Sequence, residues 1–236
     1  MMIVHPTSLS DTLDSAAEII FNQKTILPSQ RSDLAAMLTS RQIQSEPNSG
    51  YFLPFTSESG TQATLFTGEP LHNEFASHNI QLIEAARLLV LIAIDDPDSV
   101  RSIRLADRRM NMLCYSSFCA KGECKSLTIA YMRYLIASKT EAAAIRLDQL
   151  LTKLAAYRDG KGKWQGFPFY YTLLMLSESK SHEAANEIEY SASFFNRLRK
   201  QEWSKERFSN RCQSIQHRII SRREQDAYPL LLGEYG

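Results

Sequence analysis

Apolar residues recur along most of the chain at the three- and four-residue spacing of helices that bury one face. The segment "SDTLDSAAEIIF" opens with the candidate N-caps Ser10 and Asp11, and its apolar residues gather on one side. The segment "SQRSDLAAMLTSRQ", which follows Pro28, repeats this pattern. The same periodicity predicts further amphipathic helices within residues 98–113, 140–157, 181–200 and 204–223.

Three other segments are apolar on nearly every side: "EAARLLVLIAI" (84–94), "SLTIAYMRYLIA" (126–137) and "FPFYYTLLMLSE" (167–178). Helices of this kind are covered by other helices. They alternate with amphipathic segments at a period of about 40 residues, which is typical of stacked helix pairs. Buried parallel strands are also apolar, but no glycine-rich turns flank these segments and valine is scarce. The pattern predicts a single all-α domain, residues 1–236, of stacked antiparallel helix pairs that form an α/α superhelix or a partial toroid.

Residues 45–70 interrupt the helical pattern. They contain three glycines and three prolines together with several serines and threonines. Such a composition predicts one long ordered loop with a short hairpin. A long loop inside a compact domain is often functional.

Two segments that follow amphipathic helices resemble each other. "LAAMLTSRQIQSEPNSGYFLPF" (34–55) and "LLTKLAAYRDGKGKWQGFPF" (150–169) both run through a polar, glycine-containing turn to a large aromatic residue and then Pro-Phe. Gly160 or Gly162 can adopt a positive φ and end the first helix, and Pro168 suits the first turn of the next. Each segment therefore predicts a corner between two helices, with aromatic side chains filling the wedge.

The run "DGKGKWQGFPFYYTLLML" is similar to the repeat corner of the α/α-toroid proteins, which are the terpenoid cyclases and protein prenyltransferases. Repeats of that family carry a Gly- and Trp-rich turn between an outer and an inner helix. The residues that carry the resemblance are Asp159, Gly160, Trp164, Gly166 and Phe167, and more weakly Gly50, Tyr51 and Phe52. The resemblance implies a toroid-like fold with an isoprenoid or other lipid as ligand.

The chemistry of that family has no counterpart in the sequence. The D-x-D-D motif of the cyclases is absent, and "DDPDS" (95–99) instead predicts a helix start with Asp96 as N-cap. The spaced Asp, Cys and His that bind zinc in prenyltransferases cannot be placed. The chain also has fewer helix pairs than a closed ring needs.

A cysteine-rich segment, "CYSSFCAKGEC", places Cys114, Cys119 and Cys124 in a C-x4-C-x4-C pattern. Thiolates are soft ligands that suit zinc or an iron–sulfur cluster. Five-residue steps on a helix would rotate each cysteine by about 140°, so only a loop, which Gly122 permits, could gather them. The spacing favours three free thiols at a helix junction over a metal site, and no cofactor is expected.

Aromatic side chains at both corners are candidates for the lining of an apolar ligand pocket. Aromatic residues at helix corners more often belong to the core, so pocket and core both stay open. The candidates are Tyr51, Phe52 and Phe55 at the earlier corner and Trp164, Phe167, Phe169, Tyr170 and Tyr171 at the later one.

Histidines give a weaker signal. His72 and His78, with Glu69 and Glu74, could form a proton-transfer or metal cluster beside the long loop, although such residues are commonly caps or surface groups. His217 is expected on a surface. No nucleophile elbow, phosphate-binding loop, dinucleotide fingerprint or H-E-x-x-H motif is present, so the sequence does not decide whether the protein is an enzyme.

Composition and charge set the expected environment. Hydrophobic residues make up 44% and charged residues 22% of the chain, as in ordinary globular proteins. The start lacks the pattern of a signal peptide, and the apolar run "LLVLIAI" is far shorter than the roughly 20 residues that span a bilayer. Four cysteines in this context are expected to be reduced, which favours a cytoplasmic protein without a membrane span.

The net charge of +1 is distributed unevenly. Residues 197–223 carry nine Lys or Arg against two Glu, so they are basic while the rest of the chain is acidic. Such asymmetry can mark an anionic partner, although a basic run is more often the solvated face of a surface helix.

Three functional hypotheses follow. The first is a non-catalytic helical scaffold or ligand- or partner-binding protein, with residues 197–223 as a charged contact face. The second is a toroid-like enzyme or binder of an isoprenoid or other lipid. The third is nucleic-acid binding through the basic C-terminal helices, which the lack of a known fold motif disfavours. The expected partner is a protein or an apolar small molecule, and "YPLLLGEYG" at the C-terminus is a candidate contact in a homo-oligomer.

Overall fold

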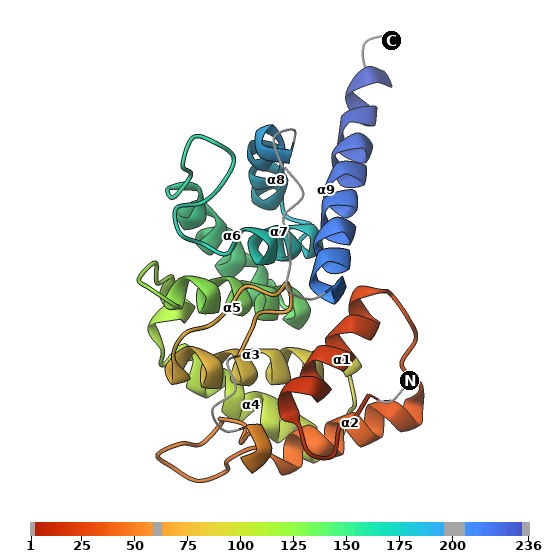
Figure 1. Ribbon diagram of the computed structural model, residues 1–236, viewed down its shortest axis with the longest axis vertical. Helices are drawn as coiled ribbons and strands as arrows, with labels where there is room; N and C mark the ends of the chain where they lie inside the picture. The colour runs from red at the N-terminus through yellow and green to blue at the C-terminus, as the bar shows by residue number, and fades with distance from the viewer. Residues whose placement is uncertain (1–2, 59–62, 196–205, 233–236) are drawn as a thin grey trace.

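The structure is a computed structural model that describes residues 3–58, 63–195 and 206–232. Within these ranges the protein is all-α, which confirms the predicted fold class (Figure 1). Two short 3-10 helices, η1 (Thr56–Glu58) and η2 (Cys114–Ser117), lie in the connections. The α-helices are α1 (Leu9–Phe21), α2 (Pro28–Ser40), α3 (Glu74–Ile92), α4 (Pro97–Asn111), α5 (Cys124–Ser138), α6 (Glu141–Ala155), α7 (Phe169–Glu178), α8 (His182–Phe195) and α9 (Glu206–Leu232).

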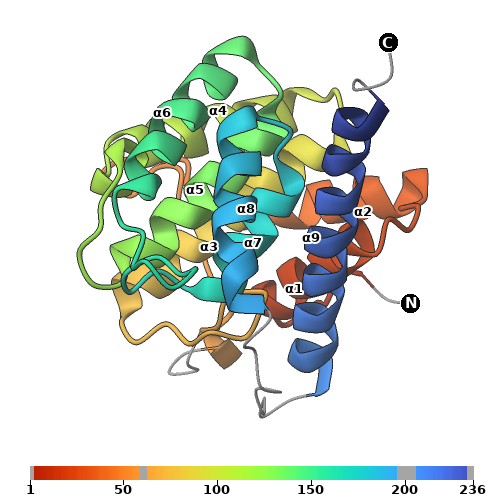
Figure 2. The same ribbon diagram turned by 90° about the horizontal axis from the view of Figure 1, so that it is seen from above.

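The helices pack as successive pairs around a central row. α1 contacts α3, α3 contacts α5, and α5 contacts α7, so helices that alternate along the chain lie side by side. α4, α6 and α8 pack against α3, α5 and α7 respectively, and α2 lies against α3 and α4. Figure 1 shows these pairs one above another, and Figure 2 shows α9 running along one side of the row. The segments that are apolar on every side therefore lie at the centre, as their sequence predicts.

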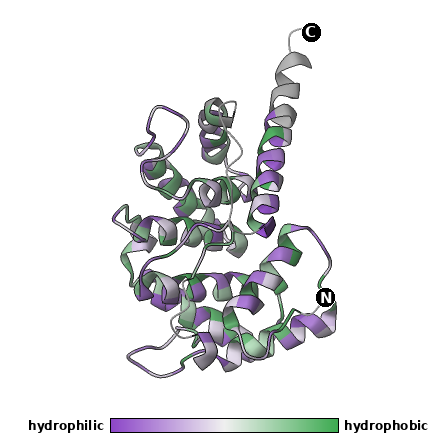
Figure 3. Ribbon diagram, in the orientation of Figure 1, coloured by the Kyte–Doolittle hydropathy of each residue, from purple (hydrophilic) through white to green (hydrophobic). Residues whose placement is uncertain are grey.

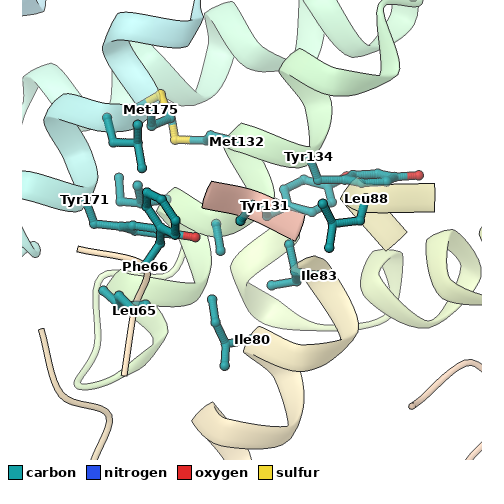
Figure 4. Packing of buried hydrophobic residues seen from close by; sticks show 14 of the residues in the cluster. Leu65, Phe66, Ile80, Ile83, Leu88, Tyr131, Met132, Tyr134, Tyr171 and Met175 are labelled. Atoms are coloured by element: carbon teal, nitrogen blue, oxygen red, sulfur yellow. The ribbon is translucent and has the colours of Figure 1, made fainter. Parts of the chain in front are cut away.

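Side chains of α3, α5 and α7 fill this centre. Figure 4 shows Ile83 and Leu88 of α3 close to Tyr131 of α5, and Met132 of α5 against Met175 of α7; all five are buried. Figure 3 shows hydrophobic and hydrophilic residues alternating along the helices. Of the described helices, α3 is long and apolar enough to span a membrane, and 67% of its apolar stretch is buried inside the protein.

Local caps explain where two of the helices begin. α4 begins as predicted, because the Asp96 carboxylate accepts the backbone N–H groups of Asp98 and Ser99. α1 begins earlier than predicted. Its N-cap is Ser8, and the Glu58 carboxylate accepts the backbone N–H groups at residues 9 and 10. The candidate caps Ser10 and Asp11 therefore lie inside the helix.

The long loop is ordered wherever the structure describes it. Two isolated antiparallel bridges, Gln42 with Phe52 and Thr64 with Pro70, close two short hairpins. The second hairpin carries the half-buried Glu69, whose carboxylate accepts the backbone N–H groups of residues 170 and 171 at 3.0 and 3.1 Å. The predicted hairpin is thus present, and the loop also caps the first turn of α7.

A network of buried charges joins the three central helices. Arg133 of α5 donates to Glu84 of α3 at 2.8 Å and to both carboxylate oxygens of Glu178 of α7 at 2.8 and 2.9 Å. Arg87 pairs with the same two carboxylates at 3.1 and 3.3 Å, and the Tyr171 hydroxyl donates to Glu84 at 2.6 Å. Two positive charges thus balance two negative charges in the centre of the protein.

Arginines of α9 turn toward the protein, not away from it. The Arg211 guanidinium is 4% exposed, pairs with Asp14 and Glu18 of α1, and stacks over the Phe66 ring at 3.8 Å. Arg222 donates to backbone carbonyls near the end of α7, and Arg223 pairs with Glu189 of α8. In the described part of the basic segment, much of the charge that suggested a contact face therefore fastens α9 to α1, α7 and α8.

Candidate functional site

Three cysteine sulfurs meet at one place between η2 and α5. The sulfurs of Cys114, Cys119 and Cys124 all lie within 4.8 Å of one another, and those of Cys114 and Cys124 are 3.6 Å apart. Within the described residues, this is the one group of three or more His, Cys, Asp or Glu side chains arranged so that it could hold a metal ion. All four cysteines are free, and Cys212 is buried elsewhere.

The backbone gathers the sulfurs because they are not on one helix. Cys114 opens η2, Cys119 lies in the following turn, and Cys124 is the first residue of α5. The turn contains two residues with positive φ, Phe118 at 80° and Gly122 at 47°. A positive φ is ordinary for glycine, but it costs a phenylalanine about 1–3 kcal/mol. We call residues 113–124 the thiol loop.

Hydrogen bonds hold the thiol loop in this shape. The Cys119 backbone N–H donates to the hydroxyl of Thr128 at 3.2 Å, and that hydroxyl donates to the Cys119 carbonyl at 3.0 Å. Arg146 and Lys153 of α6 donate to the carbonyls of Ser116 and Ser117 at 3.1 and 3.0 Å. Because α5 and α6 both fasten the loop, its conformation does not depend on the sulfurs alone.

The later aromatic corner forms a wall of the thiol loop. The Phe118 ring packs against Tyr157 and Phe167 with centroids 5.6 and 5.8 Å apart, and those two rings are 5.6 Å from each other. Lys125 of α5 lies over the Phe167 ring at 5.8 Å. A Cβ on Gly166 would come within 2.3 Å of the Lys125 ammonium. These contacts hold the strained Phe118 and so place Cys119.

The pKa values of Cys119 and Cys124 shift in opposite directions. Burial raises the pKa of the Cys119 thiol, but hydrogen bonds from the Lys121 backbone N–H and from the other two thiols outweigh it, so this pKa lies below its ordinary value. Burial and the two neighbouring sulfurs raise the pKa of Cys124 to about 12. Of these two thiols, Cys119 is therefore the one that loses its proton more readily.

The aromatic pocket candidates of the later corner are packed against other side chains. Trp164, Phe167, Tyr170 and Tyr171 are buried, and Phe169 is half-buried. Trp164 donates its indole N–H to Glu187 of α8 at 2.6 Å. The corner itself differs from the prediction in two details. Pro168, expected in the first turn of α7, is its N-cap and precedes that turn. Gly160 and Gly162 have positive φ, but they form a hairpin turn after α6 has already ended, at Ala155.

The candidates of the earlier corner lie elsewhere. Phe52 is buried in the core, while Tyr51 and Phe55 are half-buried under the guanidinium groups of Arg109 and Arg41, at 5.1 and 4.3 Å. Figure 1 shows this corner and the later one at opposite ends of the helix stack. The structure therefore does not bring the two aromatic sets together as facing walls.

Of two cavities in the described part of the protein, one lies away from these aromatic sets and the other lies beside the later corner, where the Tyr190 ring is 6.1 Å from Trp164. A groove of about 600 Å³ between α2 and the start of α4 is lined mainly by small and polar residues, among them Ala35, Thr39, Ser99 and Arg101. A second cavity, of about 460 Å³, is lined by Arg158, Asn186, Glu189 and Tyr190.

The histidine cluster predicted beside the long loop does not form. His72, Glu74 and His78 are exposed, whereas Glu69 is half-buried and its carboxylate binds the backbone at the start of α7. His217 is exposed on α9, as expected.

Comparisons of the chain with protein-family models, with curated proteins and with solved structures find no match. The fold class therefore rests on the structure itself, and the likeness of the later corner to toroid repeats rests on its residues alone.

Proposed function

We propose that this is a non-catalytic, ligand-binding helical protein and that its binding site is the thiol loop. The observation that carries the proposal is the convergence of three sulfurs within 4.8 Å of one another. The three cysteines are spread over 11 residues, and the backbone conformation brings their sulfurs together. A phenylalanine with a strained backbone and hydrogen bonds from the two flanking helices hold that conformation.

The surroundings of the sulfurs support a binding role. Cys114 is exposed and the other two are half-buried, so a ligand can reach the sulfurs from solvent while the loop stays anchored. The lowered pKa of Cys119 favours its thiolate, which is the reactive and ligating form of cysteine. Free thiols of this kind persist in a reducing compartment, so we also propose that the protein is cytoplasmic.

Other observations favour this site over the two alternative functions. Trp164 and Phe167 are buried among other side chains, and Phe167 packs against Phe118 of the thiol loop. These contacts weaken the case for an isoprenoid pocket at that corner. Arg211 and Arg222 bind α1 and α7, which weakens the case for nucleic-acid binding through α9. The resemblance of the helix pairs to toroid repeats concerns only the proposed ancestry of the fold. It assigns no role to the residues of the thiol loop.

Phenylarsine oxide tests the proposal because it binds tightly only where two or more thiols lie close together. We expect each native wild-type chain to bind one molecule of phenylarsine oxide, as measured by intact mass spectrometry. The bound compound should protect the loop cysteines from an alkylating reagent, as measured by peptide mass spectrometry. The triple variant Cys114→Ser, Cys119→Ser, Cys124→Ser should take up none. Cys212→Ser is the matched control and should behave as the wild type, because that thiol lies alone in the core. Equal uptake by the wild type and a folded triple variant would contradict the proposal.

A further inference from the structure

The thiol loop has the spacing of a mononuclear metal centre. Zinc holds thiolates at about 2.3 Å in a tetrahedron, which separates the sulfurs by about 3.8 Å. The Cys114 and Cys124 sulfurs are 3.6 Å apart, and no pair among the three sulfurs exceeds 4.8 Å. A cluster of several irons would hold its cysteine sulfurs further apart than a single ion does. We propose that Cys114, Cys119 and Cys124 bind one Zn²⁺ ion, an inference that rests on the proposed function and names the ligand of that site.

The groups around the sulfurs suit a cation held by thiolates. Cys124 begins α5, and the positive end of a helix dipole favours a negative sulfur at that position. The Lys121 charge acts on Cys119 and offsets part of the excess negative charge of three thiolates around a divalent ion. On binding, the protons of the thiols pass to the solvent as each sulfur forms its bond to zinc.

Outer contacts orient the sulfurs, as in established zinc sites. The Thr128 hydroxyl binds both backbone polar groups of Cys119, which fixes the position of its Cα and Cβ beside the other two cysteines. The ring of Phe118 fixes the preceding residue between Tyr157 and Phe167. Closing the sulfurs onto one ion then needs movements of an ångström or less along each edge of the triangle.

Three protein ligands leave one coordination position open. Structural zinc sites usually have four protein ligands, whereas sites with three keep a position for water or a small ligand. Cys114 is exposed, so the fourth position faces solvent. The core formed by α3, α5 and α7 is packed mainly by side chains of those helices, and the loop adds the buried Tyr115 to it. We therefore expect an exchangeable ion whose removal alters the thiol loop and leaves the helical core folded.

Cobalt substitution and zinc competition test the inference on the full-length protein. We expect one Co²⁺ per chain with the intense sulfur-to-cobalt charge-transfer absorption of tetrahedral thiolate sites, and its displacement by one Zn²⁺. Each of Cys114→Ser, Cys119→Ser and Cys124→Ser should weaken Zn²⁺ binding in a chelator competition by at least about 10-fold, the size of effect seen when even an outer contact of a metal site is lost. Cys212→Ser should leave the affinity unchanged.

Several outcomes would overturn the zinc assignment. One is Zn²⁺ binding that is equally tight in the triple serine variant. Another is protein that, when purified without chelators, carries Cu(I) at the loop in preference to Zn²⁺. A helical core that unfolds on chelation would refute the open, exchangeable site, and amide hydrogen exchange in α3, α5 and α7 reads this directly. If phenylarsine oxide binds and zinc does not, the thiol loop stands as a ligand site and only its ligand is wrong. If neither binds, both proposals fail.

Discussion

At the scale of single residues, Trp164 shows why the later corner looked like a ligand site. Its indole N–H donates at 2.6 Å to Glu187, a buried carboxylate that also pairs with Arg158. A buried carboxylate needs such partners, because leaving a charge in the core without them is costly. The tryptophan is therefore required for its nitrogen as well as for its size, which sequence alone does not reveal.

Replacing Trp164 by Phe keeps most of the packing and removes this donor. We expect the free energy of unfolding to fall by about 2–3 kcal/mol, since hydrogen bonds to charged groups are worth about 1.5–3 kcal/mol and a smaller ring adds a packing loss. Urea unfolding followed by circular dichroism measures the change. Ile145→Ala, at an exposed position of α6, is the control and should change stability by less than about 0.5 kcal/mol. A similarly small effect of Trp164→Phe would show that Glu187 does not depend on the indole.

The thiol loop marks the limit of prediction at this scale. The spacing of the cysteines excluded a single helix and left a loop through Gly122 as the one way to join the sulfurs. The sequence offered no sign that Phe118 would adopt a positive φ, because that conformation is imposed by Tyr157 and Phe167 from a distant part of the chain. Thr128 was missed for the same reason, since its hydroxyl serves a backbone nine residues away.

At the scale of elements, the sequence predicts helices well where their signals are local. α4 begins at the predicted cap because Asp96 and Pro97 are adjacent to it. α1 begins at Ser8 because Glu58, from the long loop, satisfies the N–H groups of its first turn. Local patterns therefore predict an end that is capped by its neighbours, and they misplace one that is capped from elsewhere in the fold.

Helix α9 gives a prediction of its own, because Arg211 forms ion pairs with two carboxylates of α1, Asp14 and Glu18. Arg211 is 4% exposed and bidentate to Asp14, whereas Arg207, which binds the same carboxylate, is 45% exposed. Arg211→Gln should lower stability by about 2 kcal/mol or more, since it leaves a partly buried carboxylate short of its main partner. Arg207→Gln, the matched control, should cost less than about 1 kcal/mol.

Amide hydrogen exchange locates the effect of these two substitutions. In the Arg211→Gln variant we expect faster exchange in α9 at residues 206–223, with α3 and α5 unchanged, because the helix opens locally before the core does. Uniform acceleration across all helices would instead show that α9 and the core unfold as one unit. Equal behaviour of the two variants would contradict the assignment of the attachment to Arg211.

At the scale of the whole molecule, the three apolar segments predicted a central row and the structure has it. The sequence did not predict that this row holds four buried charges, because Glu84, Arg87, Arg133 and Glu178 are spread over three helices and become neighbours only after packing. The uneven charge along the chain is explained in a similar way, because basic residues of α9 form ion pairs with acidic residues of α1 in the same molecule. Charge patterns that suggest partners can thus be satisfied inside a fold.

The central charges make a prediction about acid stability. Burial raises the pKa of Glu84 and of Glu178, but Arg133 and then Arg87 outweigh it, so both values lie below the ordinary 4.5. A carboxyl group whose pKa is depressed in the folded state stabilises the fold at any pH above its pKa in the unfolded state. This contribution is lost as the pH falls through its pKa in the folded state. Near pH 7 we expect these two carboxyl groups to cause no change of the free energy of unfolding with pH. Below about pH 4.5 the free energy of unfolding should decline as they take up protons.

Arg133→Met tests whether the network is responsible. Near pH 7 the variant should be less stable than the wild type by about 3–5 kcal/mol, because two buried carboxylates lose their main partner. Their pKa values should rise, so protonation now relieves a cost, and the stability gap should narrow steadily as the pH falls from 7 to 4. Arg104→Met, at an exposed position of α4, is the control and should follow the wild-type curve throughout. Parallel curves for Arg133→Met and the wild type would show that acid lability arises outside the central network, whereas converging curves assign it to the charges that join α3, α5 and α7.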